Sequence, residues 1–143
     1  MTAEDDLTPR PTALERLLAR PRRTGKVLVP LDPHQRLASG GTDLAHLGPI
    51  VTFHLRGIGA TRQSELVKDH QQGERTNVET FLPALMVEVC VEVVISDAPD
   101  EPIRALTPAT AVSILDRLAD GDAELLMAEM LRLDREATAI RAG

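Results

Sequence analysis

The amino-acid sequence predicts an α+β fold that is predominantly α-helical, with a small pair of strands near the N-terminus. Two short runs of branched apolar residues indicate the strands, at about 26–31 and 50–55. After residue 60, apolar residues recur with helical spacing in four segments. These segments are about 61–70, 80–95, 108–119 and 123–137. The last two are joined by a short connection, which predicts a C-terminal helix hairpin.

The chain of 143 residues is long enough for one domain, and 43% of its residues are hydrophobic, which is enough for a single core. Residues 1–25 are predicted to form a mobile N-terminal arm that contains one short helix, and residues 26–143 are predicted to form the compact domain. Two segments are predicted to be loops: 32–48, which is rich in Gly, Pro, Ser and Asp, and 96–106, which contains two prolines.

The segment 77–95, NVETFLPALMVEVCVEVVI, is the most apolar part of the chain, and the other elements are predicted to pack around it. Its period is ambiguous, because the alternating valines from Val87 to Val93 also fit a strand. Its length favours a helix, since the apolar run exceeds the usual strand of about 5–6 residues. Asn77 or Thr80 can cap that helix. We therefore predict a helix here.

The core is predicted to unite this helix with the two C-terminal helices. The residues expected to be buried together are Phe81, Leu85, Val89, Leu115, Leu118, Leu126 and Met130. Cys90 is predicted to be a small buried hydrophobe, because a catalytic thiol needs a polarising neighbour and some exposure. His54 is predicted to face outward from its strand.

Composition excludes several classes of function. Aromatic residues make up 1% of the chain, so a site that stacks sugars or bases is not expected. The net charge of −6 disfavours nucleic acid as a partner of the whole protein. A single cysteine permits no internal disulfide and fits a reducing cytoplasm. We expect neither a signal peptide nor a membrane-spanning segment.

Charge is distributed unevenly along the chain. Residues 1–26 hold six basic and four acidic side chains, whereas the remainder carries a net charge of −8. A solvated, mobile tail is the simpler interpretation. The alternative is a small DNA-associated or regulatory protein that uses the basic residues between 10 and 26. The acidic body and the missing helix-turn-helix pattern weigh against that alternative.

The sequence contains no compact catalytic or metal-binding motif. Four histidines are present, and none has a metal-ligand spacing from another: His34, His46, His54 and His70. Gly57 and Gly59 form a lone GxG pair, which is a weak phosphate signal. Glu88 and Glu92 are interpreted as the polar stripe of the predicted helix or as a contact with a partner's basic residue. We therefore predict a binding or assembly protein that is not an enzyme and needs no cofactor or metal.

Three stretches carry a resemblance to a known family. They are GPIVTFHLRGIGATRQSEL at 48–66, NVETFLPALMVEVCV at 77–91, and the two helical segments between Leu106 and Asp134. In these stretches, about the last two-thirds of its length, the chain resembles the tail assembly chaperones of long-tailed (siphovirus-type) phages and prophages of actinobacteria. It departs from the family pattern in lacking Trp and Tyr, and in having Gln71-Gln72 where the family usually has two prolines.

The resemblance implies a non-enzymatic protein in the host cytoplasm. It would bind the long helical tape-measure protein while the tail tube polymerises around it, in several copies and, in many members, beside a longer form made by ribosomal frameshifting. The apolar residues that surround the last helix then predict a groove for this client. The residues predicted to contact a partner are Met127, Met130, Leu131, Glu88 and Glu92, with Met127 and Leu131 expected to be exposed.

Overall fold

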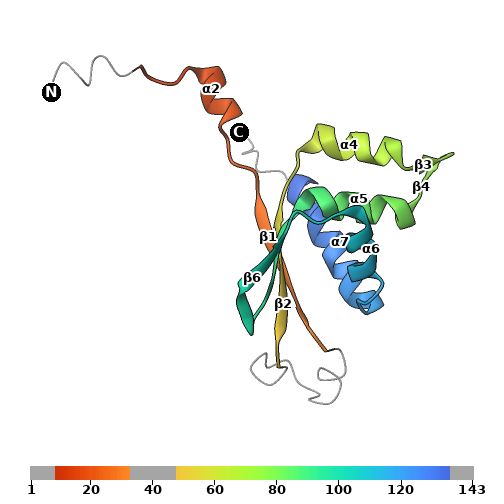
Figure 1. Cartoon of the computed structure of the whole chain (residues 1–143). Helices are drawn as coiled ribbons and strands as arrows, with labels where there is room; N and C mark the ends of the chain where they lie inside the picture. The colour runs from red at the N-terminus through yellow and green to blue at the C-terminus, as the bar shows by residue number, and fades with distance from the viewer. Residues whose placement is uncertain (1–8, 33–47, 136–143) are drawn as a thin grey trace, which may run out of the picture.

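The structure, a computed structural model, describes residues 9–32 and 48–135. In this part of the chain a four-stranded antiparallel sheet has the strand order β1-β2-β5-β6, and the helices α4 to α7 gather on one side of it (Figure 1). The strands are β1 (Thr24–Pro30), β2 (Ile50–Arg56), β5 (Cys90–Ile95) and β6 (Ala98–Arg104). The start of the predicted arm, most of the predicted loop 32–48 and the end of the last predicted helix lie outside the described residues.

The helices are α2 (Ala13–Leu18), α4 (Ala60–Asp69), α5 (Val78–Val89), α6 (Pro108–Leu115) and α7 (Asp120–Arg135). Between α4 and α5, a small hairpin of β3 (Gln71–Gln72) and β4 (Arg75–Thr76) makes the polar connection. The α+β class and the two N-terminal strands are confirmed. The sheet is twice as wide as predicted, because two further strands come from segments that were assigned to a helix and a loop.

The predicted helix at 80–95 is wrong from Cys90 onward. The helix begins as expected, since the Asn77 side chain accepts a hydrogen bond from the Glu79 backbone N–H at 3.2 Å. It ends at Val89, and the chain continues without a loop into β5. The β-branched residues that follow pair with β2, and this pairing outweighs the continuation of the helix. Glu88 and Glu92 therefore lie on different elements.

The predicted loop at 96–106 is also wrong, because most of it forms β6. The strand joins β5 through a two-residue turn at Ser96 and Asp97. Pro99 and Pro102 had argued against a strand, but β6 is an edge strand, where a missing backbone donor is tolerated. Its prolines and exposed acidic residues also make the edge a poor template for pairing with another chain.

The C-terminal helices do not pack on each other as the predicted helix hairpin requires. Helix α6 begins where expected, with the Thr107 side chain accepting a hydrogen bond from the Thr110 N–H at 3.2 Å, but it packs mainly on α5. Helix α7 packs mainly on β1. The helix comes close to Gly25 of β1, where an added Cβ atom would lie 2.6 Å from a carboxylate oxygen of Glu129.

The core lies between one face of the sheet and the helices. Five of the predicted core residues are buried, namely Phe81, Leu85, Val89, Leu126 and Met130. Leu115 and Leu118 are partly buried and pack against this core. In β2, Val51 and Leu55 face the core, while Thr52 and His54 alternate with them on the opposite face, which no described helix covers. The outward orientation predicted for His54 is confirmed.

We expect Leu85→Ala to lower the free energy of unfolding by about 2–5 kcal/mol, because the leucine is fully buried and its removal leaves a cavity. Leu125→Ala is the matched control, since this leucine is 60% exposed and its truncation should change stability little. Urea unfolding followed by circular dichroism measures both. Equal stability of the two variants would contradict the position of α5 in the core.

Candidate functional site

An apolar cavity of about 250 Å³ opens at the end of the sheet where β1 and β5 finish. All four strands of the main sheet contribute to its floor, and the connection from α6 to α7 forms its wall. Arg117 and Asp122 are the charged residues of this lining, and the others are aliphatic, aromatic or proline side chains. Leu31 and Ile103 border it while remaining 49% and 40% exposed. We call this feature the end cavity.

The end cavity suits a guest of one or two apolar side chains. Its volume lies below the range of about 300–1,000 Å³ that holds cofactors and drug-sized ligands. Its walls offer few polar groups to orient a substrate. The large apolar surfaces left exposed at its border would be shielded from water by a helix that inserts an apolar residue.

A second feature, the α5 groove, lies over α5 between α4 and α6. It consists of two adjoining depressions of about 480 and 540 Å³, which share Glu79, Pro83 and Val112. The acidic residues Asp69 and Asp116 border it together with Glu79. The groove therefore combines an apolar floor with an acidic rim.

The structure distributes the predicted contact residues of α7 differently from expectation. Met130 is fully buried beneath the helix and offers no surface to a partner. Leu131 is partly buried against the core, and Met127 is also only partly exposed. The reason is that α7 packs its apolar stripe against the sheet. Met130 belongs to that buried contact, and Leu131 and Met127 lie beside it. Leu125, at 60% exposure, has far more accessible apolar surface.

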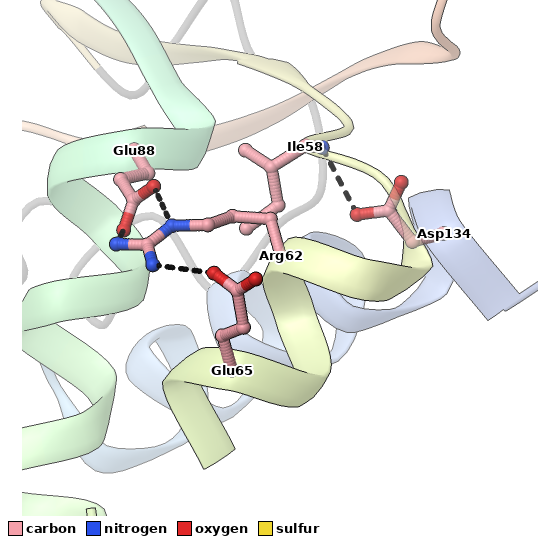
Figure 2. Close-up of polar contacts among 5 residues, drawn as sticks. All are labelled: Ile58, Arg62, Glu65, Glu88 and Asp134. Carbon is pink, nitrogen blue, oxygen red and sulfur yellow. Dashed lines mark hydrogen bonds and ion pairs between the residues drawn. The ribbon is translucent and has the colours of Figure 1, made fainter. Parts of the chain in front are cut away.

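Glu88 and Glu92 each bind an arginine of the same chain. Glu88 accepts two hydrogen bonds from Arg62 of α4, at 2.6 Å from Nε and 2.8 Å from Nη2, and Arg62 also contacts Glu65 at 3.1 Å (Figure 2). The bonds to Glu88, and then to Glu65, raise the pKa of Arg62 above its usual value. Glu92 pairs with Arg104 across the β5–β6 hairpin at 3.0 Å. Both carboxylates thus join neighbouring elements.

The glycine turn after β2 binds an internal carboxylate. Asp134, near the end of α7, accepts hydrogen bonds from the backbone N–H groups of Ile58 at 3.0 Å and Gly59 at 2.9 Å, the first of which Figure 2 shows. A Cβ atom at Gly57 would lie 2.6 Å from an Asp134 oxygen. The Gly57–Gly59 turn gave the weak phosphate signal in the sequence, and these two of its backbone donors are occupied by Asp134. No local pattern indicated their partner, which lies about 75 residues away.

The remaining candidate groups do not converge on a site. His70 places Nδ1 2.8 Å from the Thr80 hydroxyl and packs its ring edge-on against Phe81. His34 and His46 lie outside the described residues. Within residues 9–32 and 48–135, no group of three or more His, Cys, Asp or Glu side chains could hold a metal ion. In the same ranges, no helix has the length and apolar character needed to cross a membrane.

No protein-family model, curated protein or solved structure matches this chain. A function must therefore be inferred from the surfaces of the described residues and from the sequence resemblance to tail assembly chaperones. Two surfaces of the described residues that could receive another molecule are the end cavity and the α5 groove.

We expect Asp134→Ala to destabilise the protein by about 1–3 kcal/mol, because two part-buried backbone N–H groups would lose a charged acceptor. Asp134→Asn, which keeps the shape but directs an amide NH₂ at one of the two donors, should recover only part of the loss. Thermal and urea unfolding measure both variants. Wild-type stability in Asp134→Ala would show that the carboxylate does not close this turn.

Cys90 is buried as predicted, and burial raises the pKa of its thiol to about 11. We expect Ellman's reagent to react with it at pH 8 only as the protein unfolds. The unfolded thiol ionises from its ordinary pKa of 9.0, so the stability that this thiol contributes is present below pH 9 and is lost as the pH rises to about 11. Between pH 9 and about 11, the Cys90→Ala variant should therefore lose less stability than the wild type. Rapid labelling of the folded protein would contradict the burial.

Proposed function

We propose that this chain is a tail assembly chaperone that binds the tape-measure protein of a long-tailed phage or prophage in the host cytoplasm and keeps it soluble until the tail tube covers it. The order of segments in the sequence supports this proposal through the resemblance described above. The observation that carries it is the end cavity, an apolar concavity whose border leaves Leu31 and Ile103 exposed. Isolated exposed apolar residues are common, but apolar residues gathered around a cavity mark a binding surface.

The client chemistry follows from the shape and lining of the end cavity. A long helix with an apolar stripe can place one large aliphatic residue in the cavity and rest its flanking apolar residues on Leu31 and Ile103. Because the walls are almost entirely apolar, such docking depends little on the identity of the client residue. One chaperone could therefore accept successive, non-identical turns of a long client, and several copies would bind one client.

This proposal places the contact at the end cavity instead of the face of α7 that the sequence indicated. Met130 lies in the core, and Leu131 and Met127 flank it. Glu88 and Glu92 are engaged with arginines of the same chain. The two surfaces can be separated experimentally, because Leu31 and Ile103, which border the end cavity, are not on α7.

We expect coexpression with the tape-measure protein of the same phage or prophage to yield a soluble complex with several chaperone copies per client. Leu31→Asp combined with Ile103→Asp should reduce the amount of chaperone that copurifies by about tenfold, because two charges would meet the apolar face of the client. Circular dichroism checks that the double variant remains folded. Size-exclusion chromatography with light scattering measures the stoichiometry.

Leu28→Asp combined with Leu125→Asp is the matched control, because these leucines are 41% and 60% exposed and lie away from the cavity. Met127→Asp tests the α7 surface in the same assay. If the Leu31/Ile103 variant still solubilises the client, the end cavity is not the docking site. If the wild-type chain never binds the client, the chaperone proposal fails.

A further inference from the structure

The N-terminal helix α2 exposes an apolar face that no other element of the described residues covers. Every residue from 9 to 22 is exposed. Leu14, Leu17 and Leu18 are 64%, 67% and 78% exposed, and their spacing places them on one side of the helix. The helix is formed and capped, since the Thr12 hydroxyl accepts a hydrogen bond from the Glu15 N–H at 3.1 Å. In a tail that is only solvated, three leucines aligned on one side of a helix would gain no burial.

At its C-terminal end the arm is fixed to the body by two contacts. The Arg23 carbonyl accepts a hydrogen bond from the Gly57 N–H at 2.9 Å, and the Arg22 guanidinium lies against Gly59. From there towards the N-terminus the arm leaves the body, and α2 stands apart from the helices α4 to α7 (Figure 1). The leucine face is thus held near the protein and left open to other molecules.

The α5 groove has the complementary chemistry. Val78 and Val112 leave 51% and 42% of their surfaces exposed along it, over a floor that includes Pro83. Its rim residues Asp69, Glu79 and Asp116 have no ion-pair partner within the part of the chain that the structure describes. The basic residue of the groove, Arg62, is already bound by two glutamates.

The charges of the arm match this rim. Residues 9–23 contain five arginines and one glutamate, which opposes the excess of acidic residues in the rest of the chain. A short helix that carries three leucines on one side and Arg16 beside them, with Arg10 just before it, fits a groove with an apolar floor and acidic walls. The match involves both the apolar and the charged groups of the two surfaces.

We propose that α2 of one copy docks into the α5 groove of a second copy, with its leucines on the groove floor and with Arg10 and Arg16 against the acidic rim. DNA is the weaker candidate for the arm, because phosphates would engage the arginines and leave the three leucines in water. The inference does not depend on the chaperone activity proposed above, since it concerns only contacts between copies of this chain.

The contact joins two different surfaces, an arm and a groove. In a pair with only one arm docked, one copy keeps an unused groove and the other keeps an unused arm. A helix of six residues buries less surface than a standard interface, so the association should be weak and depend on concentration. Added salt should weaken the association further, because it screens the contacts between the arginines and the acidic rim.

Sedimentation equilibrium of the full chain tests the contact. We expect the average mass of the wild type to exceed that of one chain at about 100 μM or more and to fall with added salt. Leu17→Asp with Leu18→Asp on the arm, and separately Val112→Asp in the groove, should restore the mass of one chain. Leu125→Asp, an equally exposed leucine outside both surfaces, should behave as the wild type. A wild type that remains a single chain, or variants that associate like it, would overturn the proposal.

Crosslinking identifies the partner directly. One copy carries Leu18→Cys and a differently tagged copy carries Val112→Cys, while the native Cys90 is buried and does not react. A bifunctional thiol reagent should join the two different copies in the mixture. If instead the mixture gives no product and a single chain with both substitutions crosslinks internally, the arm occupies its own groove and the proposal is wrong. It is equally wrong if the Leu17/Leu18 variant loses binding to a DNA duplex while its mass is unchanged.

Discussion

The antiparallel pairing of β2 with β5 is the constraint on which the rest of the fold depends. These are the two central strands, and the segment between them contains α4, the small β3–β4 hairpin and α5. Phe53 pairs with Val93 across these strands, and both residues join the core that α4 and α5 cover. The edge strands β1 and β6 then extend the sheet, and α7 covers β1. Asp134 completes the arrangement by binding the turn that follows β2.

The parts of this fold that the sequence could predict are those specified by neighbouring residues. Thr107 and Pro108 mark the start of α6 because a hydroxyl and a ring with fixed φ satisfy the first turn locally. Asn77 does the same for α5. The alternation of Val51, Phe53 and Leu55 with polar residues identifies β2, because one face of a half-buried strand must be apolar. Burial of Cys90 followed from its apolar neighbours.

The parts that the sequence could not specify depend on distant partners. No glycine, proline or capping residue marks the boundary between Val89 and Cys90. The helix therefore ends there because the following residues pair with β2. The same holds for β6, whose prolines are acceptable only because it lies at the edge. The end cavity is assembled from four strands and the α6–α7 connection, which no sequence window contains. Met130 was a plausible contact residue on an isolated helix, and it became a core residue when α7 packed on the sheet.

The direct passage from α5 into β5 has a mechanical consequence. One side of α5 borders the α5 groove, and the strand that follows supplies Val93 and Ile95 to the end cavity. Because no flexible linker separates them, a shift of the helix along its axis cannot be absorbed between the two surfaces. Such a shift must change either the register of β5 with β2 or the irregular pairing of β5 opposite His54 and Leu55. One continuous segment thus borders both surfaces, and any free energy that couples their occupation would act equally in both directions.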